Sequence, residues 1–174
     1  MKNFDISIYG NVIVDTVYEV NSFDKNSSNI IEGKYTSLGA AANVIRELGN
    51  LNKNLNISVD SAIGNDSYGS FCKTWIKNFN KLHSSNIVSF IETTQEKTSN
   101  ALIVSSLTDN TRTSAVNWGA CQNHSKFTPH NSKWKHFMYV DKMFNLTKND
   151  LKKTSNDSII SVDFCLGNHT KRER

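Results

Sequence analysis

The chain has 174 residues, carries a formal net charge of +4, and is 37% hydrophobic and 21% charged. This length suits one domain that can bury a core of its own. The positive residues are scattered and no apolar run approaches the roughly 18 residues of a membrane span, so we expect neither nucleic acid nor a membrane as a partner.

The first segments predict a strand followed by a hairpin. Residues 4–9 alternate in polarity and end at Gly10, as a short strand does. Residues 12–20 are β-branched and apolar, which favours a second strand. The Asn- and Ser-rich stretch 21–29 predicts a turn, after which residues 30–36 return as a third strand.

A helix, a strand and a second helix come next. Residues 40–48 are rich in alanine and are followed by Gly49, which predicts a helix that ends there. Residues 57–63 form an apolar strand. Ser67 can cap a second helix over 67–79, whose aromatic residues recur at helical spacing and indicate a core-facing stripe.

The second half of the chain adds more strands and a short helix. The predicted strands cover residues 87–91, 100–107, 112–118, 137–140 and 158–163, and the predicted helix covers 145–151. The polar stretch 108–111 predicts a turn between two of the strands.

Strands that alternate with helices are typical of an α/β fold with a mostly parallel sheet and flanking helices. The β-rich excursions at about 12–36 and 100–118 interrupt this alternation. We expect them to leave the sheet as hairpins and to form a small β lid.

Polar residues and glycines gather where ligands bind in such folds, outside the carboxyl ends of the strands. Asp15 offers two acceptor oxygens for a pair of hydroxyls, and Asn43 offers a donor and an acceptor. Gly39, before a predicted helix, lets a ligand approach the backbone. These groups suit a polyol. The same residues also fit an ordinary turn glycine and a solvated aspartate.

The order of these motifs resembles the ribokinase-like (PfkB) carbohydrate kinases, in their amino-terminal, substrate-binding portion. The matching pieces are Gly10-Asn11 with Asp15, Leu38-Gly39-Ala40-Ala41-Ala42-Asn43, Gly64-Asn65-Asp66-Ser67-Tyr68-Gly69, Thr98, Asp109-Asn110-Thr111-Arg112-Thr113, Gly119-Ala120 and Val162-Asp163. Each piece is short, and the common order along nearly the whole chain carries the resemblance.

The resemblance implies a Rossmann-like partial domain over residues 1–174 and a family reaction, the ATP-dependent phosphorylation of a sugar or polyol hydroxyl. It implies ATP and Mg²⁺ as cofactors of the complete enzyme, although no motif of this chain supports either. The substrate-binding positions that it implies are Asn11, Asp15, Gly39, Ala40, Asn43, Thr98 and Arg112. Ribose, fructose, a nucleoside and other polyols all fit these residues.

The sequence departs from the family pattern at several points. Leu38 replaces the first glycine of a pair, and we expect it to narrow the sugar's approach. Cys165 and Gly167 replace an Asn and an Arg. The family's Gly-Ala-Gly-Asp segment, which supplies the anion hole and the catalytic base, is not found in the 174 residues. We expect Asp66 to cap a helix rather than to replace that base.

We therefore assign no catalytic residue and no metal ligand, and expect the chain to be incomplete and inactive alone. The alternative is a non-catalytic sugar-binding or dimerising module that forms a homodimer through its lid strands. An unrelated Rossmann-like nucleotide-binding protein is a third interpretation, which the lack of a glycine-rich phosphate loop disfavours.

Cysteine usage and the amino terminus bear on location. Cys72, Cys121 and Cys165 are far apart and odd in number, without a Cys-x-x-Cys pair, which disfavours a zinc or disulfide framework. The first five residues lack the apolar core of a secretion signal. We expect free thiols in a reducing cytoplasm.

Overall fold

The computed structural model describes residues 3–24, 26–83, 86–122, 124, 128, 130–139 and 158–163. Its strands form two sheets, a five-stranded one and a four-stranded one. The predicted helix at 145–151 and the departures at Cys165 and Gly167 lie outside the described residues.

The five-stranded sheet is parallel throughout and has the order β5-β4-β1-β8-β9. Its strands are β1 (Phe4–Tyr9), β4 (Asn56–Gly64), β5 (Asn86–Thr94), β8 (Ser132–Met138) and β9 (Ile159–Asp163). The helices are α1 (Ala41–Leu51), α2 (Ser67–His83) and the four-residue α3 (Gly119–Gln122). We call this sheet with its helices the body, and it confirms the predicted α/β fold.

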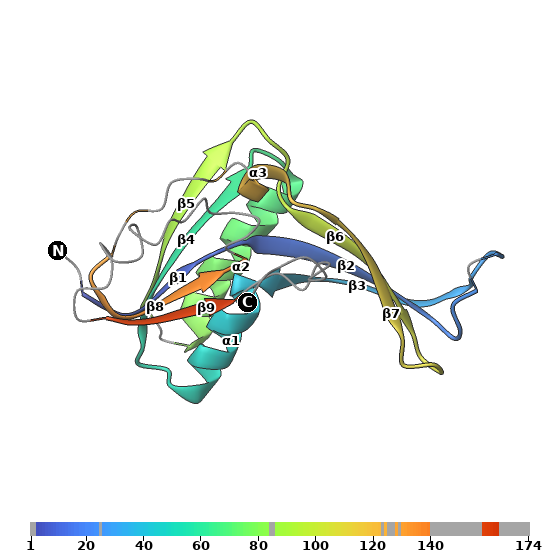
Figure 1. Cartoon of the computed structure of the whole chain (residues 1–174), viewed down its shortest axis with the longest axis horizontal. Helices are drawn as coiled ribbons and strands as arrows, with labels where there is room; N and C mark the ends of the chain where they lie inside the picture. The colour runs from blue at the N-terminus through green and yellow to red at the C-terminus, as the bar shows by residue number, and fades with distance from the viewer. Residues whose placement is uncertain are drawn as a thin grey trace, which may run out of the picture.

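The helices lie on both faces of the body sheet (Figure 1). Ile8 of β1 packs in one core cluster with Ile45 of α1 and Phe79 of α2, so these two helices cover one face. The next residue, Tyr9, points to the opposite face because side chains alternate along a strand. There it packs with Ala120 of α3.

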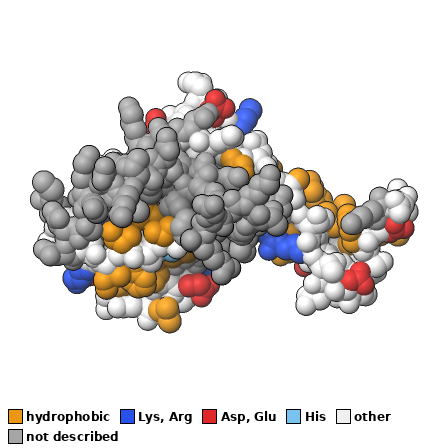
Figure 2. All heavy atoms as spheres, in the orientation of Figure 1, with side chains coloured by type: hydrophobic (Ala, Val, Ile, Leu, Met, Phe, Trp, Pro, Cys, Tyr) orange, Lys and Arg blue, Asp and Glu red, His pale blue; other side chains and the backbone are white. Residues whose placement is uncertain are grey.

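The four-stranded sheet is the predicted lid, and it extends from the body as a long twisted arm (Figures 1 and 2). Its strands are β2 (Val12–Val20), β3 (Ile31–Ala40), β6 (Asn100–Ser106) and β7 (Arg112–Asn117), in the order β3-β2-β6-β7. Two antiparallel hairpins, β2–β3 and β6–β7, join through a parallel β2–β6 pairing. The predicted small β lid is therefore confirmed.

The lid strand β3 runs longer than predicted, because its pairing with β2 continues to its last residue. Ala40 pairs with Val12, and α1 begins only at Ala41. The predicted strand over 30–36 therefore ended four residues too early, and the predicted helix began one residue too early. The alanines there have little strand preference of their own, so the pairing decides their conformation.

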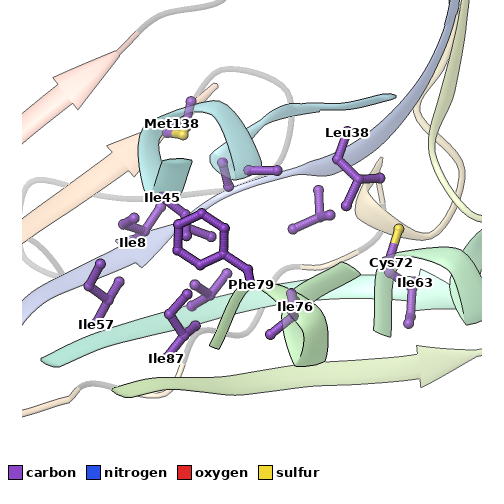
Figure 3. Close-up of a cluster of buried hydrophobic side chains, with 14 of the residues drawn as sticks. Ile8, Leu38, Ile45, Ile57, Ile63, Cys72, Ile76, Phe79, Ile87 and Met138 are labelled. Atoms are coloured by element: carbon purple, nitrogen blue, oxygen red, sulfur yellow. The ribbon is translucent and has the colours of Figure 1, made fainter. Parts of the chain in front are cut away.

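Leu38 lies in the core, which corrects our expectation that it would narrow the approach to the sugar. Its side chain is 1% exposed and belongs to the same cluster as Ile63 and Cys72 (Figure 3). Leu38 stands between Ser37 and Gly39 on β3, so its side chain points to the face opposite theirs. The bulk of this residue fills the junction of lid and body.

The strand β8 begins at Ser132, five positions before the predicted strand at 137–140. The first half of β8 was not predicted because Lys133 and Lys135 interrupt its apolar pattern. The Lys133 ammonium lies 2.8 Å from the Asp5 carboxylate on β1, and the Trp134 indole donates to Ser161 Oγ on β9 at 2.7 Å. Such partners come from neighbouring strands, which local sequence does not reveal.

Candidate functional site

The lid encloses a small cleft beside the start of α1. The cleft has a volume of about 170 Å³ and is lined by Asp15, Val17, Tyr35, Ser37, Asn43, Ile103, Ser105 and Arg112. These residues come from all four lid strands and from the first turn of α1. The strand pairing explains the convergence, because Ser37 of β3 and Ala101 of β6 flank Asp15 on either side.

The Asp15 carboxyl is half-buried in the cleft wall. Burial raises the pKa of this carboxyl, and the nearby Arg112 guanidinium offsets that effect only in part. Within the described ranges we find no hydrogen bond to its oxygens. Since the carboxyl is only half-buried, solvent reaches its oxygens, and a ligand that supplies hydroxyl donors can take the place of that solvent.

Gly39 has no Cβ, and the Asp15 carboxylate occupies the space that a Cβ would take. A Cβ at Gly39 would overlap Asp15 Oδ2 and crowd the Ile13 side chain. Gly39 pairs with Ile13 on β2, two residues before Asp15. This glycine therefore makes room for the aspartate rather than lying among the residues that line the cleft.

Asn43 and Arg112 reach the cleft from opposite sides. Asn43 lies in the first turn of α1, and its Oδ1 accepts a hydrogen bond from Arg46 Nη1 at 3.0 Å. That contact leaves the amide N–H groups of Asn43 to donate to a ligand. Arg112 begins β7, pairs with Ser105 of β6 and is exposed. Three of the predicted site residues, Asp15, Asn43 and Arg112, are thus brought together.

Asn11 and Ala40 do not line this cleft. Asn11 is fully buried, its carbonyl oxygen accepts from the Ala41 N–H at 2.9 Å, and its amide has no partner in the part of the chain that the structure describes. Ala40 has a φ of 52° and a ψ of −118° where β3 turns into α1. Such a positive φ is strained for a residue with a Cβ.

Thr98 also lies away from the cleft, in a buried network at the base of the lid. Its hydroxyl donates to Asp66 Oδ1 at 2.5 Å and accepts from the Gly64 N–H at 2.9 Å. Its own N–H donates to Asp66 Oδ2 at 2.9 Å. Since the hydroxyl is committed and the residue is 0% exposed, Thr98 fits a structural role better than the substrate contact that the resemblance implied.

Asp66 is the cap of α2, as we expected of this residue. Its Oδ1 accepts a hydrogen bond from the Gly69 N–H at 2.8 Å, in the first turn of the helix. Burial raises the pKa of Asp66, but the bonds from Thr98 and Gly69 outweigh that effect and hold it below its usual value. The prediction that Ser67 caps α2 was wrong by one residue.

Solved structures of nucleoside kinases and ribokinases are similar to this chain. The nucleoside kinase of Methanocaldococcus jannaschii, an archaeal member of the ribokinase family, matches 94% of the chain at 22% identity with a TM-score of 0.61. The ribokinases of Giardia lamblia and Cryptococcus neoformans each match 95% of it, at 16% and 13% identity, with TM-scores of 0.71 and 0.68. The chain has the ribokinase fold.

The chain spans about half the length of these kinases, 52%, 52% and 51% in the same order. The sequence matches no family model and no curated protein. The similarity to these solved structures confirms the resemblance to ribokinase-like kinases that the motifs predicted. The Cryptococcus structure was solved in complex with ADP.

Several cleft residues of this ribokinase fold were missed by sequence reasoning. Ser37 and Tyr35 lie on β3 at alternate positions before Gly39, and Ser105 lies across the sheet on β6. The period of two along β3, counted back from Gly39, could have found the first two. Ser105 depends on the parallel register between β2 and β6, for which the sequence holds no local signal.

A second cleft, of about 480 Å³, lies toward the tip of the lid. It is lined by Phe23, Val104, Asp109, Thr111, Arg112 and Thr113. Val104 stands between Ile103 and Ser105 on β6 and so points to the opposite face of the lid. Arg112, on the edge strand β7, is the residue that both clefts share.

A buried polar cluster lies on the α3 side of the body sheet. His124 Nε2 lies 2.9 Å from Asp60 Oδ1, and His124 Nδ1 lies 3.4 Å from Glu92 Oε2. The Thr128 N–H donates to Asp60 Oδ2 at 2.8 Å. Burial lowers the pKa of His124, but the two carboxylates raise it further and leave it above 6.5. These contacts tie residues 124 and 128 to β4.

Proposed function

We propose that the cleft binds hydroxyl groups of a sugar, a nucleoside or a related polyol. The observation that carries this proposal is Asp15, a half-buried carboxylate on the cleft wall without a hydrogen-bond donor among the described residues. Its two oxygens can accept from a pair of neighbouring hydroxyls. Hydrogen bonds to a charged group stabilise a complex by about 1.5–3 kcal/mol each.

The other cleft residues supply what a polyol requires besides acceptors. Asn43 can donate to a hydroxyl oxygen, and Ser37 and Ser105 can both donate and accept. Val17 and the ring of Tyr35 offer apolar surface to the C–H groups of a sugar. The cleft wall is mostly polar, which suits a ligand that is rich in hydroxyl groups.

We further propose that residues 1–174 form part of a kinase that phosphorylates such a hydroxyl with ATP. The support is the ribokinase fold, shared with nucleoside kinases and ribokinases about twice as long. Phosphoryl transfer requires Mg²⁺ and donors around the developing charge. Among the described residues no three His, Cys, Asp or Glu side chains could hold a metal ion, and the cleft of about 170 Å³ does not fit a nucleotide as well as a polyol. We therefore assign polyol recognition alone to these residues.

Calorimetric titration with ribose, fructose and adenosine tests the proposal. We expect Asp15→Asn to weaken binding of the polyol that binds best at least tenfold, because the variant loses charge and one acceptor oxygen. Glu19→Gln is the matched control, since Glu19 lies on the same face of the same strand but does not line the cleft. Unchanged affinity in Asp15→Asn would show that the cleft is not the site.

A dimerising module is the second candidate, and the exposed edge of the lid favours it. All residues of β7 are exposed, and among the described strands it pairs with β6 alone. An open strand edge can pair with another chain. Sedimentation equilibrium from 1 to 100 μM tests this candidate, which predicts a concentration-dependent dimer and is contradicted by a monomer throughout.

No helix in the described ranges is long and apolar enough to cross a membrane.

A further inference from the structure

We propose that two histidines around Asp60 make the joint between lid and body sensitive to pH, and that the joint is tightest when His124 is charged and His130 is neutral. The joint is the stretch that follows lid strand β7 and precedes body strand β8, and its described residues are 118–122, 124, 128 and 130. This device acts on how the lid is held and does not depend on the polyol site.

The first part of the joint is tied to the base of the lid. Its helix α3 lies where β6 and β7 leave the body (Figure 1). The Ala120 N–H donates to the Lys97 carbonyl oxygen at 2.7 Å, and Ser99 Oγ donates to the Trp118 carbonyl oxygen at 2.5 Å. Residues 97 and 99 come directly before β6. These bonds therefore fix the point at which this strand enters the lid.

The second part of the joint is tied to the body by the carboxylate of Asp60 on β4. Asp60 Oδ1 lies 2.9 Å from His124 Nε2. Asp60 Oδ2 accepts a hydrogen bond from the Thr128 N–H at 2.8 Å and lies 3.8 Å from His130 Nε2. Since Asp60 is 3% exposed, a single buried carboxylate contacts the joint at three positions.

One buried carboxylate can compensate one buried imidazolium, and a second positive charge beside it would be costly. His124 also lies near Glu92 of β5, with 3.4 Å between Nδ1 and Oε2. Burial lowers the pKa of His124, but Asp60 and Glu92 together raise it above 6.5. Burial also lowers the pKa of His130, and there Asp60 offsets the effect only in part. The proton therefore belongs to His124.

The other groups around His130 keep it neutral. Its ring stacks on the Tyr9 ring of β1, with 6.0 Å between the centroids and 9° between the planes, and its backbone N–H donates to the Tyr9 hydroxyl at 3.0 Å. Burial raises the pKa of Tyr9, so this phenol carries no charge near neutral pH. Lys135 of β8 lies on the same face as Phe137, and burial lowers its pKa. The Cys121 thiol of α3 donates to the Ala62 carbonyl oxygen at 3.0 Å.

The two shifts oppose each other on either side of about pH 6.5, the ordinary pKa of histidine. Above this pH, the stability that His124 contributes is lost as the pH rises through its raised pKa. Below it, the open joint takes up a proton on His130 that the closed joint does not, so the closed joint loses stability as the pH falls. The joint should therefore open toward both acid and alkaline pH.

Nuclear magnetic resonance on the full chain without ligand tests this device. Histidine side-chain nitrogen shifts from pH 5 to 9 should show that His124 loses its proton above pH 6.5 and His130 below it. The protection of the Thr128 amide, corrected for its intrinsic exchange rate, should peak near pH 6.5 and fall by about threefold or more at pH 5 and at pH 9.

Three variants assign the two changes to their residues. His130→Gln should remove the acid fall in Thr128 protection, and His124→Gln should remove the alkaline fall. His136→Gln is the matched control, because His136 lies on the opposite face of β8 from Phe137 and its Nδ1 lies 2.7 Å from Ser161 Oγ; it should leave both falls in place.

The titration of the parent chain decides the inference even if a variant does not fold. His124 and His130 that lose their protons at the same pH, or in the reverse order, would overturn it. Thr128 protection that stays level from pH 5 to 9 would overturn it as well, because the histidines would then titrate without acting on the joint. None of these outcomes bears on the polyol site, since no ligand is present.

Discussion

The hydrogen-bond network of Thr98 at the lid base gives a prediction with a calculable size. Thr98→Val replaces the hydroxyl with a methyl group of similar volume. The variant loses the bond to Asp66 Oδ1 and leaves the Gly64 N–H without its acceptor. The methyl group also cannot approach the carboxylate as closely as the hydroxyl does, at 2.5 Å.

These losses set the expected magnitude. A hydrogen bond to a charged group contributes about 1.5–3 kcal/mol, and a buried N–H left unpaired costs about 1–3 kcal/mol. Asp66 is partly exposed and keeps its bonds from the backbone N–H groups of Thr98 and Gly69, so part of the first loss is recovered. We expect Thr98→Val to lower the free energy of unfolding by about 2–4 kcal/mol.

Urea denaturation followed by tryptophan fluorescence measures this loss. Thr98→Ser is the matched control, because it keeps the hydroxyl and should cost only about 1 kcal/mol for one buried methyl group. A double-mutant cycle with Asp66→Asn should show a coupling of about 1–2 kcal/mol. A Thr98→Val variant within 0.5 kcal/mol of the parent, or additive effects in the cycle, would refute the role of this network.

Three further predictions follow from single contacts. Gly39→Ala should weaken polyol binding at least tenfold in calorimetry with little loss of stability, since its Cβ would displace the Asp15 carboxylate; unchanged affinity contradicts this. Leu38→Ala should lower the free energy of unfolding, measured in urea, by about 2–5 kcal/mol without tightening polyol binding, because Leu38 lies in the core. Tighter polyol binding in this variant would show that the Leu38 side chain narrows the approach to the sugar. His124→Gln should lower the stability most below pH 6.5, because, against the effect of burial, Asp60 and Glu92 raise the pKa of His124 and so stabilise the protonated folded form. The loss should shrink as the pH rises through that raised pKa. A difference between parent and variant that grows toward pH 9 in thermal melts contradicts the ion pairing of His124 with these carboxylates.

Local patterns predicted most of the elements that shape this fold. The alternation in residues 4–9, the β-branched run 12–20 and the alanine-rich stretch that begins at residue 40 are properties of neighbouring residues, and the structure confirms a strand, a strand and a helix there. The prediction that this helix ends at Gly49 was wrong, because α1 continues through Gly49 to Leu51. The first half of β8 was missed because Lys133 and Lys135 take their environment from β1 and β9. Such pairing joins residues far apart in the sequence, which periodicity does not record.

The order of the motifs predicted some of the residues that line the cleft, but not all of them. The resemblance placed Asp15, Asn43 and Arg112 among the candidates, and the structure brings them to one cleft. It also suggested Thr98, whose hydroxyl turns out to be committed to Asp66. Leu38 was expected to narrow the approach to the sugar because it replaces a family glycine. It lies one position from Ser37 within β3, so its side chain points to the other face, into the core.

Amide hydrogen exchange with and without a bound polyol tests the central claim most directly. The chain is compared free and at saturation with whichever of ribose, fructose and adenosine binds most tightly. The account predicts slower exchange confined to residues 13–17, 35–43, 101–105 and 112, which surround the cleft. Protection that instead falls on β8 and β9 of the body, with the lid unchanged, would contradict a polyol site at Asp15.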